Sequence, residues 1–167
     1  DSTGNYQYFL NLPWISIYRA IDWGYSPDPA VCLWVAVLPD GHEVVFKERH
    51  WKRTLAKDVA KAIVTESKGM HVVDTFADPS IFGKDGNSDY SIAEIFEMNG
   101  VPMQAMQNDR TLFGYVICEH LDSLQTVEHK GRERARPKMQ ILEDDWKGLG
   151  CPNLLRTIPT MTMDTND

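Results

Sequence analysis

The sequence predicts an α/β fold in which a mixed β-sheet of three antiparallel strands followed by parallel strands is flanked by helices. Three β-rich runs joined by short turns lie near the N-terminus, and an amphipathic helical pattern separates them from a fourth run. Shorter helix and strand patterns then alternate. The length of 167 residues favours one domain, 1–167, with an N-terminal extension at 1–13 and a polar tail at 159–167.

The first three strands are expected at 14–22, 31–38 and 42–51. The first run, WISIYRAID, ends at Trp23-Gly24, and the turn formers Pro39-Asp40-Gly41 follow the second. Connections this short join neighbouring strands in antiparallel pairs, so the three strands are expected to form a meander.

The hydrophobic period changes over 53–67, which predicts a helix. Its apolar stripe consists of Leu55, Val59, Ala62 and Ile63. Thr54 is the expected N-cap and Gly69 the expected stop. A fourth strand at 71–76 follows this crossover helix, which favours parallel pairing with an earlier strand.

The second half of the chain contains shorter elements. We expect a helix from Ser91 to Asn99-Gly100, a strand at 101–106, a helix from Asp109, a strand at 139–142 and a helical turn at 153–158. Three antiparallel strands, a helix and then a parallel strand make the ribonuclease H-like order. That order places the end of strand one beside the end of strand four.

Two aspartates, Asp22 and Asp78, end apolar strand patterns and precede turn formers. Neighbouring carboxylates suit a hard divalent cation such as Mg²⁺ or Mn²⁺. Two such ions, roughly 3.5–4 Å apart, would support hydrolysis of phosphate esters. The alternative for each residue is a turn or cap role, which is common for Asp before Gly or Pro.

Composition narrows the classes of function. No run of roughly 18 apolar residues is present, so no membrane span is expected. The three cysteines have no zinc spacing and are typical of reduced intracellular thiols. The net charge of −7 argues against a nucleic-acid partner, although clustered basic residues and bound cations would offset it locally.

The segment HKGRERARPK, 129–138, is the strongest basic cluster. Its cations fall on even positions: Lys130, Arg132, Arg134, Arg136 and Lys138. In an extended strand they share one face and Glu133 takes the other, so the segment is predicted to follow a DNA backbone with little sequence preference. The alternative is a solvated surface loop.

Other acidic residues are weaker candidates. Glu48 could be an extra metal ligand or support one, but an edge-strand surface position is favoured. Asp74 shares the expected face of Asp78, and a structural role is favoured for it. Asp144-Asp145 is read as a turn.

Four segments together resemble the nuclease domain of the large terminase subunit of tailed bacteriophages. They are IYRAIDWGYSPDPAV, ADPS, EIFEMNGVPMQAMQNDRTLFGYVI and PNLLRTIP, from about Tyr18 to Pro159. The resemblance implies a ribonuclease H-like fold close to the Holliday-junction resolvases. It also implies metal-dependent cleavage of double-stranded, concatemeric viral DNA, with Asp22 and Asp78 matching the first two metal-binding aspartates.

The resemblance further implies a third acidic ligand beyond the LLRTIP helix. Asp164 and Asp167 are candidates, against a solvated tail or an acid that follows Asp167. The implied partners are the terminase ATPase domain, whose GxxxxGK[ST] loop does not occur here, the portal and the small terminase subunit. The implied location is the host-cell cytoplasm and not the virion.

Two alternatives to a packaging nuclease stay open. One is a DNA-binding or motor-docking module of the same fold that does not cleave DNA. The other is a resolvase-type nuclease.

Overall fold

The computed structural model describes residues 11–84, 86, 88–107, 110–129, 131–143 and 148–158, without the side chains of 110–113, 127–129, 132 and 134. The elements follow one another as β1 (Ser16–Asp22), β2 (Ala30–Val37), β3 (Glu43–Trp51), α2 (Ala56–Glu66), β4 (Val72–Ala77), the 3₁₀ turn η1 (Pro79–Phe82), α3 (Ile92–Met98), β5 (Gln104–Ala105), α4 (Arg110–Asp122), β6 (Leu124–His129), β7 (Arg132–Pro137), β8 (Met139–Ile141) and α5 (Pro152–Thr157).

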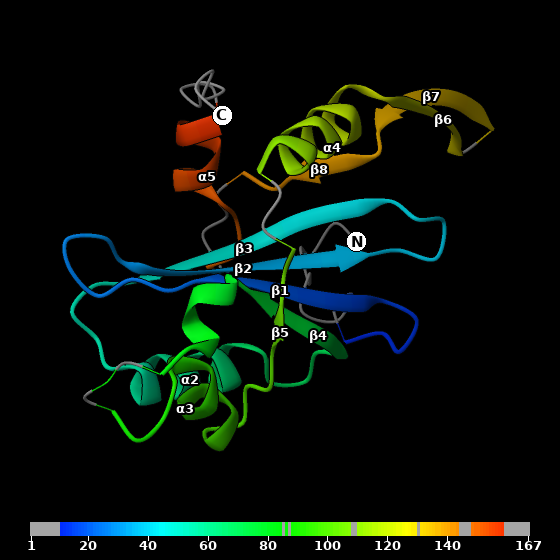
Figure 1. Cartoon of the computed structure of the whole chain (residues 1–167). Helices are drawn as coiled ribbons and strands as arrows, with labels where there is room; N and C mark the ends of the chain where they lie inside the picture. Colours follow the sequence, from blue (N-terminus) through cyan, green and yellow to red (C-terminus); the bar gives the residue numbers. More distant parts are fainter. Residues whose placement is uncertain are drawn as a thin grey trace.

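One six-stranded sheet organises the molecule, in the order β5-β4-β1-β2-β3-β8 (Figure 1). Strands β1, β2 and β3 pair antiparallel, whereas β4 pairs parallel to β1 and β5 parallel to β4. This confirms the predicted ribonuclease H-like order. Strand β8 adds a parallel edge beside β3, and β6 and β7 form a separate two-stranded hairpin.

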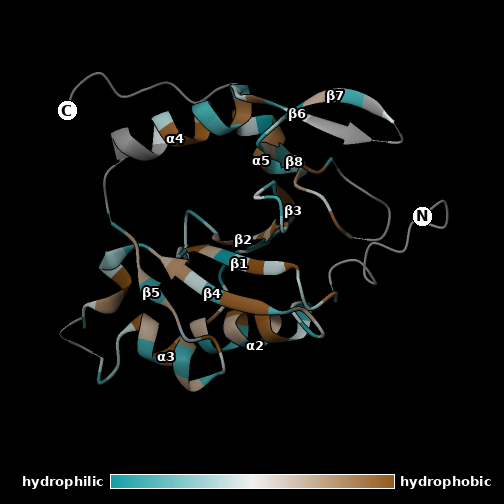
Figure 2. Ribbon diagram, turned by 90° about the vertical axis from the view of Figure 1, so that its right-hand side faces the viewer, coloured by the Kyte–Doolittle hydropathy of each residue, from teal (hydrophilic) through white to brown (hydrophobic). Residues whose placement is uncertain are grey.

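The two faces of the sheet carry different layers. Helices α2 and α3 lie on one side, while α4, α5 and the β6–β7 hairpin lie on the other (Figures 1 and 2). No helix in the described part of the chain is long and apolar enough to cross a bilayer.

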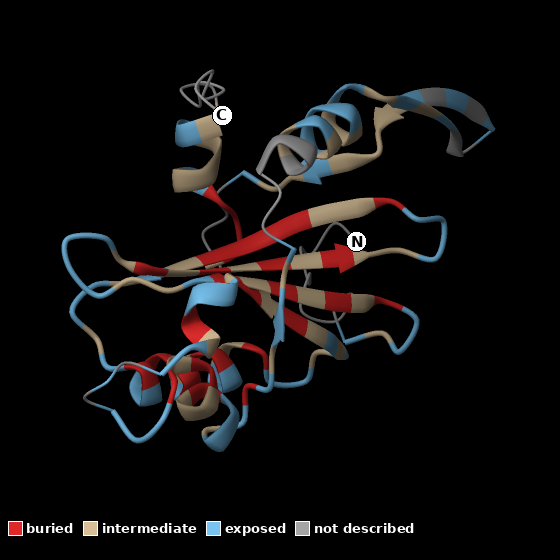
Figure 3. Cartoon of the chain, viewed as in Figure 1, coloured by how far each residue is buried: buried red, intermediate tan, exposed pale blue. Residues whose placement is uncertain are grey.

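Burial alternates along the central strands, as expected for side chains of period two (Figure 3). In β2 the residues that face α2 and α3 are 0–1% exposed: Ala30, Cys32, Trp34 and Ala36. The intervening residues of β2 are only half-buried. The main core therefore lies between the sheet and α2 with α3, and the opposite face is more open.

The N-caps of α3 and α2 differ in how well they follow the capping residues expected from the sequence. The helix expected to begin at Ser91 is confirmed as α3, and Ser91 caps it through a reciprocal capping box with Glu94. The prediction of Thr54 as the cap of α2 is wrong. Leu55 is the N-cap, and its apolar side chain offers no acceptor, while the Thr54 hydroxyl donates to the Lys52 carbonyl.

Strand β5 is shorter than the predicted 101–106. The Val101 N–H bonds to the Phe96 carbonyl and so completes the end of α3, and Pro102 has no N–H for a ladder. Only Gln104 and Ala105 remain to pair with Phe76 and Ala77 of β4.

Buried Arg19 links β1 to its parallel neighbour. Its Nε donates to Thr75 Oγ1 (2.9 Å), directly across the β1–β4 ladder, and its Nη1 donates to Ser67 Oγ (3.3 Å) after α2. The same Ser67 oxygen accepts from Trp34 Nε1 at 2.9 Å. Burial lowers the pKa of the Arg19 guanidinium, which shows that this contact carries a desolvation cost.

We expect Arg19→Ala to lower the free energy of unfolding by about 2–4 kcal/mol, because it leaves a cavity and removes the donor to two buried hydroxyls. Urea unfolding measures the change. The control Lys57→Ala, an exposed substitution on α2, should change stability by less than about 0.5 kcal/mol. Equal effects of both substitutions would contradict the role assigned to Arg19.

Candidate functional site

The two predicted aspartates end neighbouring parallel strands. Ile21 of β1 pairs with Ala77 of β4, and both are buried. Asp22 and Asp78 are the next residues in each chain segment, so the ladder brings them to the same edge of the sheet. Asp22 is exposed and Asp78 is half-buried, so both remain within reach of solvent.

The chain leaves β1 in a tightly packed turn. Trp23 packs edge-on against Phe96 of α3, with ring centroids 5.7 Å apart. A Cβ on Gly24 would come within 2.6 Å of the Pro29 carbonyl oxygen, so only glycine allows this close approach. The Arg53 N–H then bonds the Tyr25 carbonyl. These contacts fix the backbone directly after Asp22.

Asp78 also has a structural role. Its Oδ1 accepts the Ser80 N–H at 2.8 Å and caps η1, which begins with Pro79. The cap role that the sequence offered as the alternative to metal binding is therefore present at Asp78. A carboxylate offers about four lone-pair sites, so one N–H bond is compatible with coordination of a cation.

Asp74 shares the strand face of Phe76 on β4. Its Oδ2 accepts from Gln104 Nε2 of β5 (2.6 Å), and its Oδ1 accepts the Thr75 N–H. Asp74 thus ties β5 to β4, which agrees with the structural role favoured for it.

Glu48 is not on the surface as favoured from the sequence. It is 5% exposed and caps α5: Oε1 accepts from Asn153 N (2.7 Å) and Nδ2 (2.8 Å), and Oε2 accepts from Leu154 N (2.9 Å). The N-cap residue of α5, Cys151, provides no side-chain bond, which leaves its first N–H groups for Glu48. Burial and the Glu48 charge raise the pKa of the Cys151 thiol to about 12.

A third metal-binding acid is not found in the part of the chain that the structure describes, where no group of three His, Cys, Asp or Glu side chains could hold an ion. The candidates Asp164 and Asp167, and the pair Asp144-Asp145, lie outside the described residues.

Strand β7 covers 132–137 of the predicted basic segment 129–138, and Lys138 follows the strand. Arg132, Arg134 and Arg136 occupy alternate positions opposite His129, Val127 and Gln125 of β6, whereas Glu133 lies opposite Glu128. By backbone register, positions 132, 134 and 136 therefore belong to one strand face, and positions 128 and 133 belong to the other. Lys130 lies outside the described residues, and DNA contact by this face stays a prediction.

The strand order and the helices on both faces of the sheet define a ribonuclease H-like α/β fold. Solved structures that are similar to it include two large terminase nucleases. The large terminase nuclease from thermophilic phage G20c has 15% identity over 75% of this chain and 74% of that chain, with a TM-score of 0.42. The g2p (large terminase) nuclease domain from bacteriophage SPP1, with bound Mn, has 16% identity over 75% and 76%, with a TM-score of 0.34.

Both structures come from the family that the sequence resembles. No family model and no curated protein matches the chain.

We expect Glu48→Gln to lower the free energy of unfolding by about 1–3 kcal/mol, because an amide nitrogen would face one of the α5 N–H groups. Hydrogen exchange should accelerate at the amides of Asn153 and Leu154. Glu143→Gln, at an exposed position before α5, is the matched control and should change neither quantity. Unchanged protection of both amides in the Glu48 variant would contradict the cap.

Proposed function

We propose that this chain is a divalent-metal-dependent endonuclease domain that hydrolyses double-stranded DNA, of the type found in large terminase subunits. The observation that carries the proposal is the β1–β4 ladder, in which the Ile21–Ala77 pair precedes Asp22 and Asp78. This register brings two solvent-accessible carboxylates to one sheet edge.

The donor set fits Mg²⁺ or Mn²⁺. Such ions accept oxygen ligands, and Mg²⁺ usually keeps several waters while it binds one or two carboxylates and substrate phosphates. Asp22 and Asp78 would hold the metal, with Asp167 proposed as a further acid. When bound, the metal would lower the pKa of water and offset the negative charge that develops on the phosphodiester.

The chain itself would hold and orient the reacting groups. The turn at Gly24 and the η1 cap fix the backbone around the two aspartates. Arg132 and Arg134 of the hairpin would hold the duplex by its phosphates, without reading bases. The net charge of −7 makes this local segregation of charge important for binding DNA.

The biological setting that we propose is cleavage of concatemeric viral DNA during packaging, in the host-cell cytoplasm. The ATPase domain, portal and small subunit of the terminase would be the partners. These proposals rest on the resemblance of the sequence segments.

The second candidate is a DNA-binding or motor-docking module that does not cleave. It is favoured by one observation: the described residues supply no third acid beside Asp22 and Asp78. Plasmid digestion in Mg²⁺ or Mn²⁺, with EDTA as control, separates the two candidates.

We expect Asp22→Asn and Asp78→Asn each to reduce plasmid cleavage about 1,000-fold or more, because each loses a charged metal ligand worth several kcal/mol in the transition state. The metal-dependent rise in melting temperature should also disappear. Asn at position 78 keeps an acceptor for the Ser80 N–H, so the η1 cap survives.

The matched control is Asp28→Asn, at an exposed position in the loop after Asp22. It should retain cleavage and metal-dependent stabilisation. Full cleavage by the Asp22→Asn, Asp78→Asn double variant would overturn the proposed site. Duplex binding without cleavage by the wild-type chain, in either metal, would support the second candidate.

A further inference from the structure

The end of the hairpin nearest the sheet, at 136–138, is called its root, and polar contacts join it to the sheet. Lys138 follows β7, and its carbonyl accepts the Glu43 N–H at 2.9 Å, while its N–H bonds the Ser123 carbonyl at the end of α4. Its Nζ lies 2.9 Å from His120 Nε2, and His120 Nδ1 lies 2.9 Å from Glu43 Oε2. Lys138 is therefore engaged at the joint between hairpin, α4 and β3.

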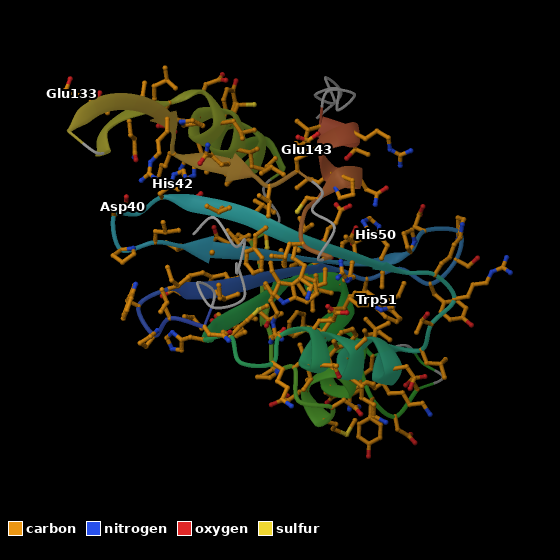
Figure 4. The ribbon with its side chains drawn as sticks, turned by 180° about the vertical axis from the view of Figure 1, so that it is seen from behind. Asp40, His42, His50, Trp51, Glu133 and Glu143 are labelled. Atoms are coloured by element: carbon orange, nitrogen blue, oxygen red, sulfur yellow. The ribbon has the colours of Figure 1, made fainter. Side chains whose placement is uncertain are left out.

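Arg136 is the next cation along the same strand face, and it forms an ion pair with Asp40. Asp40 belongs to the turn between β2 and β3, below the hairpin (Figure 4). The Arg136 side chain is 24% exposed and that of Asp40 is 54% exposed, so the pair lies at the protein surface. A polyanion on the arginine face would meet a cation that is already neutralised.

Asp40 is held in place for this contact. Its Oδ1 accepts the His42 N–H at 3.1 Å, which orders the turn, and its Oδ2 accepts from Arg136. The hydrogen bond from the His42 N–H, together with Arg136, lowers the pKa of the Asp40 carboxyl. Asp40 is therefore ionised at neutral pH.

We propose that Asp40 acts as an internal stand-in for a DNA phosphate, which withholds Arg136 from the duplex and limits the affinity of the hairpin for polyanions. The proposal rests on the proposed function only in taking duplex DNA as the polyanion. It distinguishes the cations of the hairpin: Arg136 is withheld by Asp40, whereas Arg132 and Arg134 lie further from the root and are assigned to phosphate contact.

The salt dependence of binding gives a direct readout. Each phosphate neutralised by a protein cation adds about 0.9 to the slope of log affinity against log salt. One additional contact therefore enlarges the loss of affinity between about 50 and 200 mM salt by roughly 3.5-fold. A change in the number of cations that contact phosphate thus alters the slope, whereas a general change in the charge of the protein alters the affinity without this change in slope.

The test uses Asp40→Asn. Asparagine keeps an oxygen that accepts the His42 N–H, but it loses the negative charge and the second acceptor oxygen. The matched control is Glu133→Gln, which removes one negative charge from the opposite strand face of the same hairpin, at an exposed position near its outer end (Figure 4). Binding to a short duplex of arbitrary sequence is measured by anisotropy in EDTA, so that cleavage does not contribute.

We expect Asp40→Asn to bind more tightly at low salt and to show the roughly 3.5-fold larger salt effect, while Glu133→Gln keeps the wild-type slope. Arg136→Gln should leave the wild-type slope unchanged and should abolish the gain when combined with Asp40→Asn. Equal slopes for Asp40→Asn and Glu133→Gln would overturn the proposal, as would a reduced slope for Arg136→Gln alone.

The failure of the proposed function would look different. If the wild-type chain and Asp40→Asn both fail to bind duplex at low salt, duplex DNA is not the ligand of the hairpin, and both the proposed function and the role of Asp40 are wrong. If the wild-type chain binds and the slopes of the two acid variants coincide, only the role of Asp40 is lost. Circular dichroism of each variant verifies that the fold is retained.

Discussion

The parallel pairing of β1 with β4 is the constraint on which the site depends. Strand β4 begins at Val72, about 50 residues after the end of β1, so the chain needs the α2 crossover to return in the parallel direction. Arg19 and Thr75 face each other in that ladder, and Ser67 joins Arg19 to Trp34 of β2. A slip by one residue would turn the side chains of β4 to the other face. The buried network thus sets the register that brings Asp22 beside Asp78.

Carboxylates on the open side of the sheet differ in their burial and in the number of hydrogen bonds that they accept. Glu48 is aligned with Leu33 of β2 and Ala20 of β1 across the sheet, but it is buried and accepts three hydrogen bonds from α5. Asp78 gives one oxygen to a cap and stays partly accessible. Burial and full hydrogen bonding suit an anchor, whereas a metal ligand must meet water and substrate. Accessibility therefore separates these acids more clearly than their position on the sheet does.

Features that depend on local spacing could be predicted from the sequence, and contacts between distant segments could not. The Ser91–Glu94 box and the aspartates at the ends of β1 and β4 follow from short patterns. The cap of α5 comes from Glu48, more than 100 residues earlier. The only indication in the sequence is that Cys151, directly before Pro152, does not have a typical capping side chain. The ion pair of Arg136 is a second contact between distant segments. The alternation of basic residues predicted Arg136 on the basic face, but nothing in that pattern indicates its partner Asp40 in the turn between β2 and β3.

The arrangement of the hairpin reconciles an acidic chain with the polyanion that we propose as its substrate. Attachment to the sheet uses the root cations: Arg136 contacts Asp40, and Lys138 contacts His120, which in turn contacts Glu43. Strand β8 continues directly from this root and pairs with β3, so the joint is part of the sheet edge. The acids at the root are therefore matched by cations, while β7 places Arg132 and Arg134 further out, opposite His129 and Val127. Local pairing of charge, and not the net charge, then decides where an anion can bind.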